Sequence, residues 1–157
     1  MSNIKILSIY EVLERGIEFS GDVCYSGEWG QQVYNRPIED GGSPITGLVF
    51  EKRSNCGLVY YCYYKNGIPD GPSVMFYKSG EPKSYDDMVK GVRHGKSIHW
   101  YENGNVKSVA ECKYGVEISF KKMDENGQVI EEKNKLTEFE RALIEKYENV
   151  ENKQGLE

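Results

Sequence analysis

The stretch FYKSGEPKS at residues 76–84 is followed 24 residues later by WYENGNVKS at residues 100–108. Each begins with two aromatic residues, carries a glycine at the same place and ends on Lys-Ser. Similar stretches at a fixed distance are typical of a repeat architecture, in which every unit folds in the same way. Glycines keep this period at positions 47, 71 and 95, at 67, 91 and 115, and at 80 and 104. The sequence therefore predicts a tandem array of 24-residue units.

Each unit is predicted to be a β-hairpin. The segments PSVMFYK (72–78) and KSIHWYE (96–102) place alternate apolar side chains on two faces, as strands do. Two-residue type I′ turns, whose central residues have positive φ, are predicted for Ser-Gly or Asn-Gly at 79–80, 103–104 and 126–127. The chain then returns through a second strand to a G-x-x-x-G stretch, at 67–71 or 91–95, which is interpreted as the loop into the next hairpin.

Consecutive hairpins of this kind build one long antiparallel sheet. Equivalent residues of neighbouring units then lie two strands apart, about 9–10 Å, so that Phe76, Trp100 and Met123 form an apolar ladder. No single hairpin buries such a ladder, and each unit is stable only beside its neighbours. With 17 Gly and 12 Tyr in 157 residues, the composition also indicates a turn-rich β protein. The predicted fold class is mainly β.

The period is clear only in residues 60–133, which are predicted to be the repeat array. Residues 1–59 are expected to form an irregular β region with two strands and a longer loop at about 35–46. A chain of 157 residues suits one domain with a single core, and the predicted domain spans 1–157.

A C-terminal helix is predicted over 137–150. Thr137 and Glu140 have the spacing of a capping box, in which the two side chains satisfy backbone N–H groups at the start of a helix. The apolar residues of the segment fall on one stripe: Phe139, Leu143, Tyr147 and Val150.

A short helix is also expected over 8–15. Ser8 and Glu11 repeat the capping pattern, and Gly16 is placed to cap the C-terminal end. A strand in this segment is the alternative. Either helix is suited to cover an exposed end of the sheet.

The formal charge of −5 is unevenly distributed. Residues 1–60 carry eight acidic and five basic side chains. Residues 61–115 carry six acidic and eight basic side chains, and residues 116–157 carry eleven acidic and seven basic ones. No cluster of Lys and Arg is interleaved with aromatic residues, which argues against partners such as nucleic acid or anionic lipid. The sequence has no run of about 20 apolar residues and no cleavable leader, so a cytoplasmic protein without a membrane partner is expected.

Nothing in the pattern of residues indicates catalysis, a metal or a cofactor. The four cysteines lack metal-ligand spacing and are interpreted as reduced core thiols, with a zinc site as the less favoured alternative. His94 falls in a predicted loop and His99 on a strand, without a nucleophile in a recognised context. Asp86 and Asp87 are neighbours on a strand and point to opposite faces, so they are no acid/base pair. The protein is predicted not to be an enzyme.

The repeat unit resembles the variant MORN repeats of bacterial YwqK-type proteins. It reads G-x-x-x-x-[FW]-Y-x-x-G-x-x-K-S and ends in K-x-G-x-x-x-G or a near match. The similar segments are YYKNGIPDG (63–71), GPSVMFYKSGEPKSYDDMVKGVRHG (71–95), GKSIHWYENGNVKSVAECKYG (95–115) and DENGQVIEE (124–132). The resemblance implies tandem β-hairpins in an elongated curved sheet, and an antitoxin or immunity protein that neutralises a toxin by binding it. Arrays of the MORN type also serve as scaffolds.

Tyrosines are the candidates for contact with a partner. In VYYCYYKNG (59–67), alternation places Tyr61 and Tyr63 on one face and Tyr60 and Tyr64 on the other. One pair is expected in the core and the other on the surface, where Tyr is enriched at binding hot spots. The predicted partner-binding residues are Tyr61, Tyr63, Tyr77, Asp87, Tyr101 and Glu111.

Two hypotheses for function remain open. The first is an immunity protein that occludes the active site or substrate cleft of a cognate toxin protein. The acidic ends favour a nuclease or a deaminase as the toxin, because such clefts are positively charged and attract an acidic partner. The alternative is a non-catalytic scaffold that mediates protein–protein interactions through the same sheet. No oligomeric state is predicted.

Overall fold

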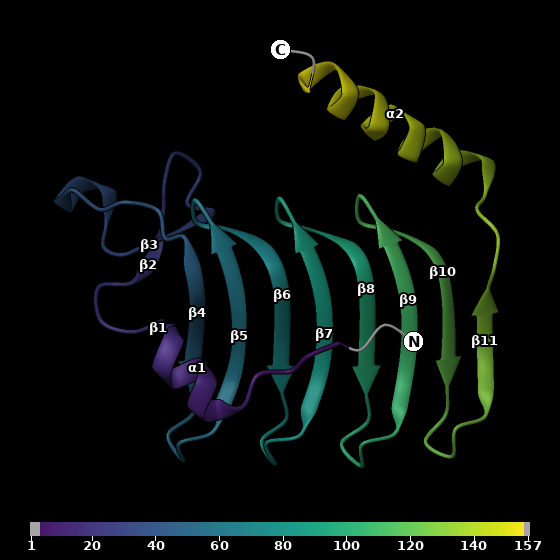
Figure 1. Ribbon diagram of the computed structural model, residues 1–157, viewed down its shortest axis with the longest axis horizontal. Helices are drawn as coiled ribbons and strands as arrows, with labels where there is room; N and C mark the ends of the chain where they lie inside the picture. Colours follow the sequence, from purple (N-terminus) through teal and green to yellow (C-terminus); the bar gives the residue numbers. More distant parts are fainter. Residues whose placement is uncertain (1–3, 156–157) are drawn as a thin grey trace.

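The structure of the protein, a computed structural model, describes residues 4–155 (Figure 1). Eight consecutive strands form its middle: β4 (Gly47–Lys52), β5 (Leu58–Lys65), β6 (Ile68–Phe76), β7 (Pro82–Val89), β8 (Val92–Trp100), β9 (Val106–Lys113), β10 (Val116–Met123) and β11 (Val129–Lys133). They lie side by side in chain order, each antiparallel to the next, and β1 (Ile17–Glu18) adds a short parallel strand beside β4. This elongated, curved sheet of hairpins confirms the predicted fold class.

Smaller elements lie at both ends of the chain. The N-terminal region contains helix α1 (Ile9–Arg15), a two-stranded sheet of β2 (Cys24–Ser26) and β3 (Gln32–Tyr34), and the 3-10 helix η1 (Ile38–Asp40). Helix α2 (Glu138–Gln154) follows the last strand. Among the described residues, no helix is long and apolar enough to cross a membrane.

The type I′ turns lie at the opposite edge of the sheet from the one predicted. Ser79 and Asn103 do not have positive φ, and the Gly80 N–H donates to the Tyr77 carbonyl at 3.0 Å in a three-residue turn that ends on the left-handed Gly80. The Ser79 hydroxyl accepts from the N–H of Glu81, and Asn103 accepts in the same way from Asn105. The prediction was wrong because these side chains stabilise a type I turn with the residue before glycine at negative φ.

The true two-residue turns join β5 to β6, β7 to β8 and β9 to β10. Their central pairs, which all have positive φ, are Asn66-Gly67, Lys90-Gly91 and Tyr114-Gly115. The G-x-x-x-G stretches predicted as loops therefore begin at these turns and continue inside strands β6 and β8.

Gly95 shows why a glycine recurs inside the strands. Asp87 of β7 lies opposite the three residues 94–96 of β8, so the longer strand bulges at this point. Gly95 has a φ of 125°, and a Cβ atom there would lie 2.9 Å from the Cβ of Asp87. Only glycine accommodates both the conformation and the close approach.

The array begins earlier than residue 60. The β4–β5 turn has the same hydrogen bonds as the later turns, because the Arg53 N–H donates to the Gly57 carbonyl at 2.6 Å and the Cys56 N–H to the Arg53 carbonyl at 3.1 Å. Cys56 has a φ of 68° at the position that Gly80 and Gly104 occupy in the following units. The series of glycines at Gly80 and Gly104 does not extend back to the β4–β5 turn, because Cys56 adopts the left-handed conformation in place of a glycine.

Neighbouring hairpins are joined by side chains at equivalent positions. The Tyr77 hydroxyl donates to the Trp100 carbonyl at 2.7 Å, and the Tyr101 hydroxyl donates to the Met123 carbonyl at 3.0 Å. Arg53, one unit before Tyr77, donates from Nη2 to the Phe76 carbonyl at 2.9 Å. This repeated bond contributes to the stability that each hairpin gains from its neighbour.

Replacing Tyr101 by Phe is expected to lower the free energy of unfolding by about 1 kcal/mol, the usual value of one hydrogen bond. The ring stays in place, so the packing of the hairpin is retained. Chemical denaturation measures the change, with Tyr77→Phe as the equivalent variant one unit earlier. A loss below about 0.3 kcal/mol in both variants would show that the bond contributes little.

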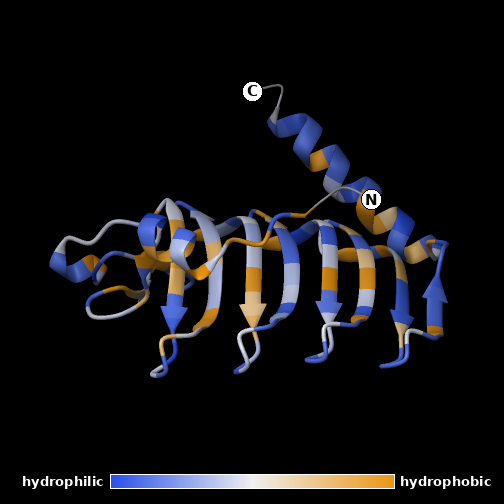
Figure 2. Ribbon diagram, turned by 60° about the horizontal axis from the view of Figure 1, so that its bottom comes forward, coloured by the Kyte–Doolittle hydropathy of each residue, from blue (hydrophilic) through white to orange (hydrophobic). Residues whose placement is uncertain are grey.

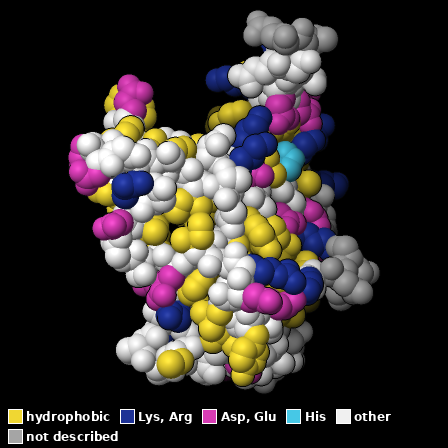
Figure 3. Space-filling model, turned by 60° about the vertical axis from the view of Figure 1, so that its left-hand side comes forward, with side chains coloured by type: hydrophobic (Ala, Val, Ile, Leu, Met, Phe, Trp, Pro, Cys, Tyr) yellow, Lys and Arg dark blue, Asp and Glu magenta, His cyan; other side chains and the backbone are white. Residues whose placement is uncertain are grey.

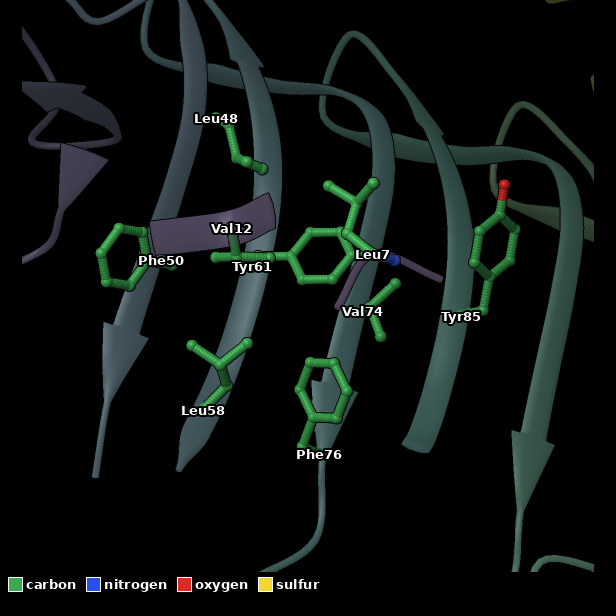
Figure 4. Packing of buried hydrophobic residues seen from close by; sticks show 9 residues of the cluster. All are labelled: Leu7, Val12, Leu48, Phe50, Leu58, Tyr61, Val74, Phe76 and Tyr85. Carbon is green, nitrogen blue, oxygen red and sulfur yellow. The ribbon is translucent and has the colours of Figure 1, made fainter. Parts of the chain in front are cut away.

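Two apolar clusters pack on opposite faces of the sheet. The front face, which carries Tyr61 and Val74, is covered by α1 and the segment before it (Figure 4). The back face carries Cys62 and Tyr64 and is covered by Val33 and other residues of the region around β2 and β3. Of the four cysteines predicted in the core, Cys62 and Cys112 are buried, Cys24 is half-buried and Cys56 is exposed.

The predicted helices are present. Ser8 and Glu11 form a capping box at the start of α1, and Gly16 caps its end. The hydrogen bonds that the Glu11 carboxylate accepts from the backbone N–H of Ser8 and from Lys5 lower its pKa to about 2.

Helix α2 has the capping box of Thr137 and Glu140 and extends beyond the predicted end to Gln154. It does not cover the sheet edge at β11. It crosses above the turn between β9 and β10, where the Tyr147 ring stacks on Tyr114 at 5.4 Å and the Tyr114 hydroxyl donates to Glu151 at 2.7 Å. Figure 2 shows that α2 stands away from the sheet and is mostly hydrophilic. Most of the predicted apolar stripe stays exposed: Phe139, Tyr147 and Val150.

Candidate protein-binding face

One continuous row of side chains crosses the front face of the sheet. Direct cross-strand pairing joins its members from β4 to β11: Phe50, Tyr61, Val74, Tyr85, Ile98, Val109, Lys121 and Glu132. Residues that pair directly in this way point to the same side of a sheet. The first six are aromatic or aliphatic, so the row is an apolar stripe that ends in two charged residues.

Among residues 4–155, the segment that covers this stripe does not extend over its last residues. The first four residues of the row, from Phe50 to Tyr85, are buried in the cluster that includes Leu7 and Val12 of the N-terminal segment. Ile98 is half-buried, and Val109 is 38% exposed. Trp100 packs against the edge of the covered cluster and is also half-buried.

The part of the front face over β8 to β10 is called the open half. It comprises Ile98, Trp100, Val106, Val109 and Glu111, with Lys96 and Lys121 at its margin. The charged residues include both signs, because Lys96 pairs across the strands with Glu111 and the Lys121 ammonium lies 3.8 Å from the Glu132 carboxylate. An apolar centre with a charged margin is the usual anatomy of a protein–protein interface.

Tyr61 does not belong to this surface, and its prediction as a partner contact is corrected. Its side chain is fully buried, and its hydroxyl accepts a hydrogen bond from the Leu7 N–H at 2.9 Å. The N-terminal segment covers this tyrosine, which alternation along β5 alone does not reveal. Tyr61 is a core residue that fastens the N-terminal segment to the sheet.

Three other predicted residues share one level of the front face. Tyr63, Asp87 and Glu111 lie at equivalent positions of β5, β7 and β9, and Glu111 is exposed beside the open half. Asp87 already has partners: one carboxylate oxygen accepts from the Tyr85 hydroxyl at 2.6 Å, and the other accepts from the Lys96 N–H at 2.9 Å. Burial raises the pKa of Tyr85, and the bond to Asp87 adds to this shift.

The predicted contacts Tyr77 and Tyr101 lie at the turn edge of the sheet. Their hydroxyl groups bind backbone carbonyls of the next hairpin, so only parts of their rings are accessible. The hydroxyl joins the hairpins, and a lysine ammonium lies 5.6 Å from the centroid of each ring. Contact of these two residues with a partner stays a prediction.

The back face carries a polar cluster over β7 and β8. The Ser97 hydroxyl donates to Asp86 at 2.6 Å, and the His99 Nε2 lies 3.9 Å from the same carboxylate oxygen. Although burial opposes the shift, the nearby His99 and the hydrogen bond from Ser97 hold the pKa of Asp86 below its ordinary value. The serine donates to the aspartate instead of to the histidine, so the cluster does not form an activated nucleophile.

The second histidine has a backbone partner. The His94 Nδ1 accepts from the Tyr114 N–H at 3.1 Å, which fixes the ring beside the β9–β10 turn. Within residues 4–155, no group of three or more His, Cys, Asp or Glu side chains is arranged to hold a metal ion.

Comparison with known proteins gives one partial likeness. A stretch of 60 residues is 34% identical to the Immunity protein YwqK of Bacillus subtilis (strain 168). The stretch covers 38% of this chain and 38% of that protein. No family model matches the chain. No solved structure matches it.

Proposed function

We propose that this protein is an immunity protein, which binds a cognate bacterial toxin through the open half and occludes the toxin's active site or substrate cleft. The observation that carries the proposal is the apolar row of the front face, which, within residues 4–155, continues past the N-terminal segment that covers it to the exposed Val109. Soluble proteins bury a contiguous apolar surface of this kind against a partner. A curved sheet of mutually supporting hairpins provides a rigid platform for such contact.

The likeness to the Immunity protein YwqK supports the same function, because that protein is named as an immunity protein. We also propose that the 24-residue unit is a variant MORN repeat and that the protein acts in the cytoplasm. The toxin is proposed to be a nuclease or a deaminase, and the protein acts by binding without chemistry of its own.

Co-expression tests this function. The product of the neighbouring open reading frame is expressed from an inducible promoter, alone and with this protein, and growth is followed. We expect growth arrest by the toxin, rescue by this protein, and recovery of a stable complex when a catalytically inactive toxin is used as bait. Absence of both rescue and complex would contradict the proposal. Weak binding to several partners without rescue of growth would favour the alternative function, a non-catalytic scaffold.

A further inference from the structure

A second exposed apolar surface lies at the other end of the sheet, in residues 17–46. Trp29 is 78% exposed in the turn between β2 and β3, Tyr25 is 60% exposed on β2, and Ile38 of η1 is also exposed. These side chains lie outside the open half and outside the repeat. Tryptophan and tyrosine in exposed positions are the residue types most enriched at binding hot spots.

Strand β3, which follows Trp29, is hydrogen-bonded to the array. The Val33 N–H donates to the Gly67 carbonyl at 2.9 Å, the Gly67 N–H donates to the Ile45 carbonyl at 2.7 Å, and Gln32 donates to the Asn66 carbonyl at 2.8 Å. A cavity of about 410 Å³ opens beside the indole ring and is lined by Gln31, Gln32, Ile68, Pro69, Lys90 and Gly91. Trp29 therefore lies in a turn whose following strand is hydrogen-bonded to the array, beside a recess that admits a partner's side chain.

The segment 17–46 is acidic, and the cation that lines the recess beside Trp29, Lys90, belongs to the array. Residues 17–46 contain five carboxylates, Glu18, Asp22, Glu28, Glu39 and Asp40, against one cation, Arg36. Glu18 is paired with Lys52 at 3.2 Å, and the other four are exposed and form no ion pair with any residue of 4–155. The Ile38 N–H donates to the Ser26 hydroxyl at 3.2 Å, which places η1 beside the strand that leads to Trp29. In Figure 3, hydrophobic side chains on this end lie close to acidic ones.

We infer that Trp29 and the carboxylates around it form a second contact with the toxin, and that the toxin surface meeting them is basic. This inference rests on the proposed function and identifies the chemistry of the partner. A Lys or Arg side chain of the toxin lies over the Trp29 indole, where the π-system attracts a cation, while Glu28, Glu39 and Asp40 attract the surrounding positive charge. A second copy of the chain is a poor occupant, because it would bring two acidic surfaces together.

The test measures binding of the inactive toxin to three proteins: the wild type, Trp29→Ala, and a triple variant with Glu28→Gln, Glu39→Gln and Asp40→Asn. The affinity of the Trp29→Ala variant for the toxin is expected to be about 30-fold or more below that of the wild type, as for loss of a hot-spot residue. The triple variant is expected to associate about 10-fold more slowly at low ionic strength, and this difference should vanish near 1 M salt, where the screening length is about 3 Å.

Two matched controls show whether the effects belong to this end of the molecule. Tyr10→Ala removes an aromatic residue that is 81% exposed elsewhere, and Glu102→Gln, Glu125→Gln and Glu145→Gln together remove three exposed carboxylates elsewhere. Toxin binding with wild-type strength and salt dependence in both test variants would overturn the inference and leave the proposed function standing. Failure of the wild type to bind would overturn both.

Discussion

A Tyr61→Ala variant is expected to lose about 3–5 kcal/mol of unfolding free energy, the range measured for removal of a large buried aromatic side chain. Tyr61 is fully buried at the centre of the front-face cluster, where its ring lies 6.0 Å from that of Phe76. The substitution leaves a cavity and also removes the acceptor of the Leu7 N–H. Both effects weaken the attachment of the N-terminal segment to the sheet.

Urea denaturation followed by circular dichroism measures this change, with Tyr10→Ala as the control. Tyr10 is exposed on α1, and its removal is expected to change the free energy by no more than about 0.5 kcal/mol. A loss below about 1 kcal/mol for Tyr61→Ala would be too small for a fully buried residue. Such a result would place the tyrosine at the surface, as the sequence first suggested.

The second large effect is expected in toxin binding. Val109→Arg should weaken the affinity for the toxin about 100-fold or more, because it places an unpaired charge and extra volume at the centre of the proposed interface. The side chain is already 38% exposed in the free protein, so the folded state should accept the arginine with little loss of stability. Isothermal titration calorimetry with the inactive toxin measures the affinity.

Met75→Arg is the matched control for this variant. Met75 is 44% exposed on β6, and it pairs with Tyr60 and Ser84 in the row of the back face. The same change of residue size and charge on that face should leave toxin affinity within about twofold of the wild type, a difference of about 0.4 kcal/mol. If Met75→Arg abolished binding and Val109→Arg did not, the toxin would bind the back face.

Much of the fold follows from short-range rules that the sequence displays directly. The 24-residue period indicated the hairpins, and the capping boxes at Ser8 and Thr137 located both helices. The turn types were assigned wrongly because Asn-Gly suits more than one hairpin turn, and the choice depends on a hydrogen bond that the asparagine side chain accepts from the backbone. The first hairpin was missed because Cys56 takes the place of the expected glycine.

The candidate site was harder to predict because it depends on what covers the sheet. Alternation shows that Tyr61 and Tyr63 share a face, yet only the path of residues 4–15 determines that Tyr61 is buried. Val109 occupies the same position of the 24-residue unit as Tyr61 and Tyr85 in the earlier units. This equivalence was only a weak indication that Val109 belongs to the binding face. Trp29 lies outside the repeat, and no period marks it.

Hydroxyl-radical footprinting of the complex with inactive toxin tests the proposed binding face most directly. This method reports the solvent accessibility of individual side chains by their rate of oxidation. The proposal predicts that Trp100 and Val109 are oxidised more slowly in the complex than in the free protein, while Met75 on the back face is oxidised at the same rate in both. Unchanged oxidation of Trp100 and Val109 together with protection of Met75 would contradict it.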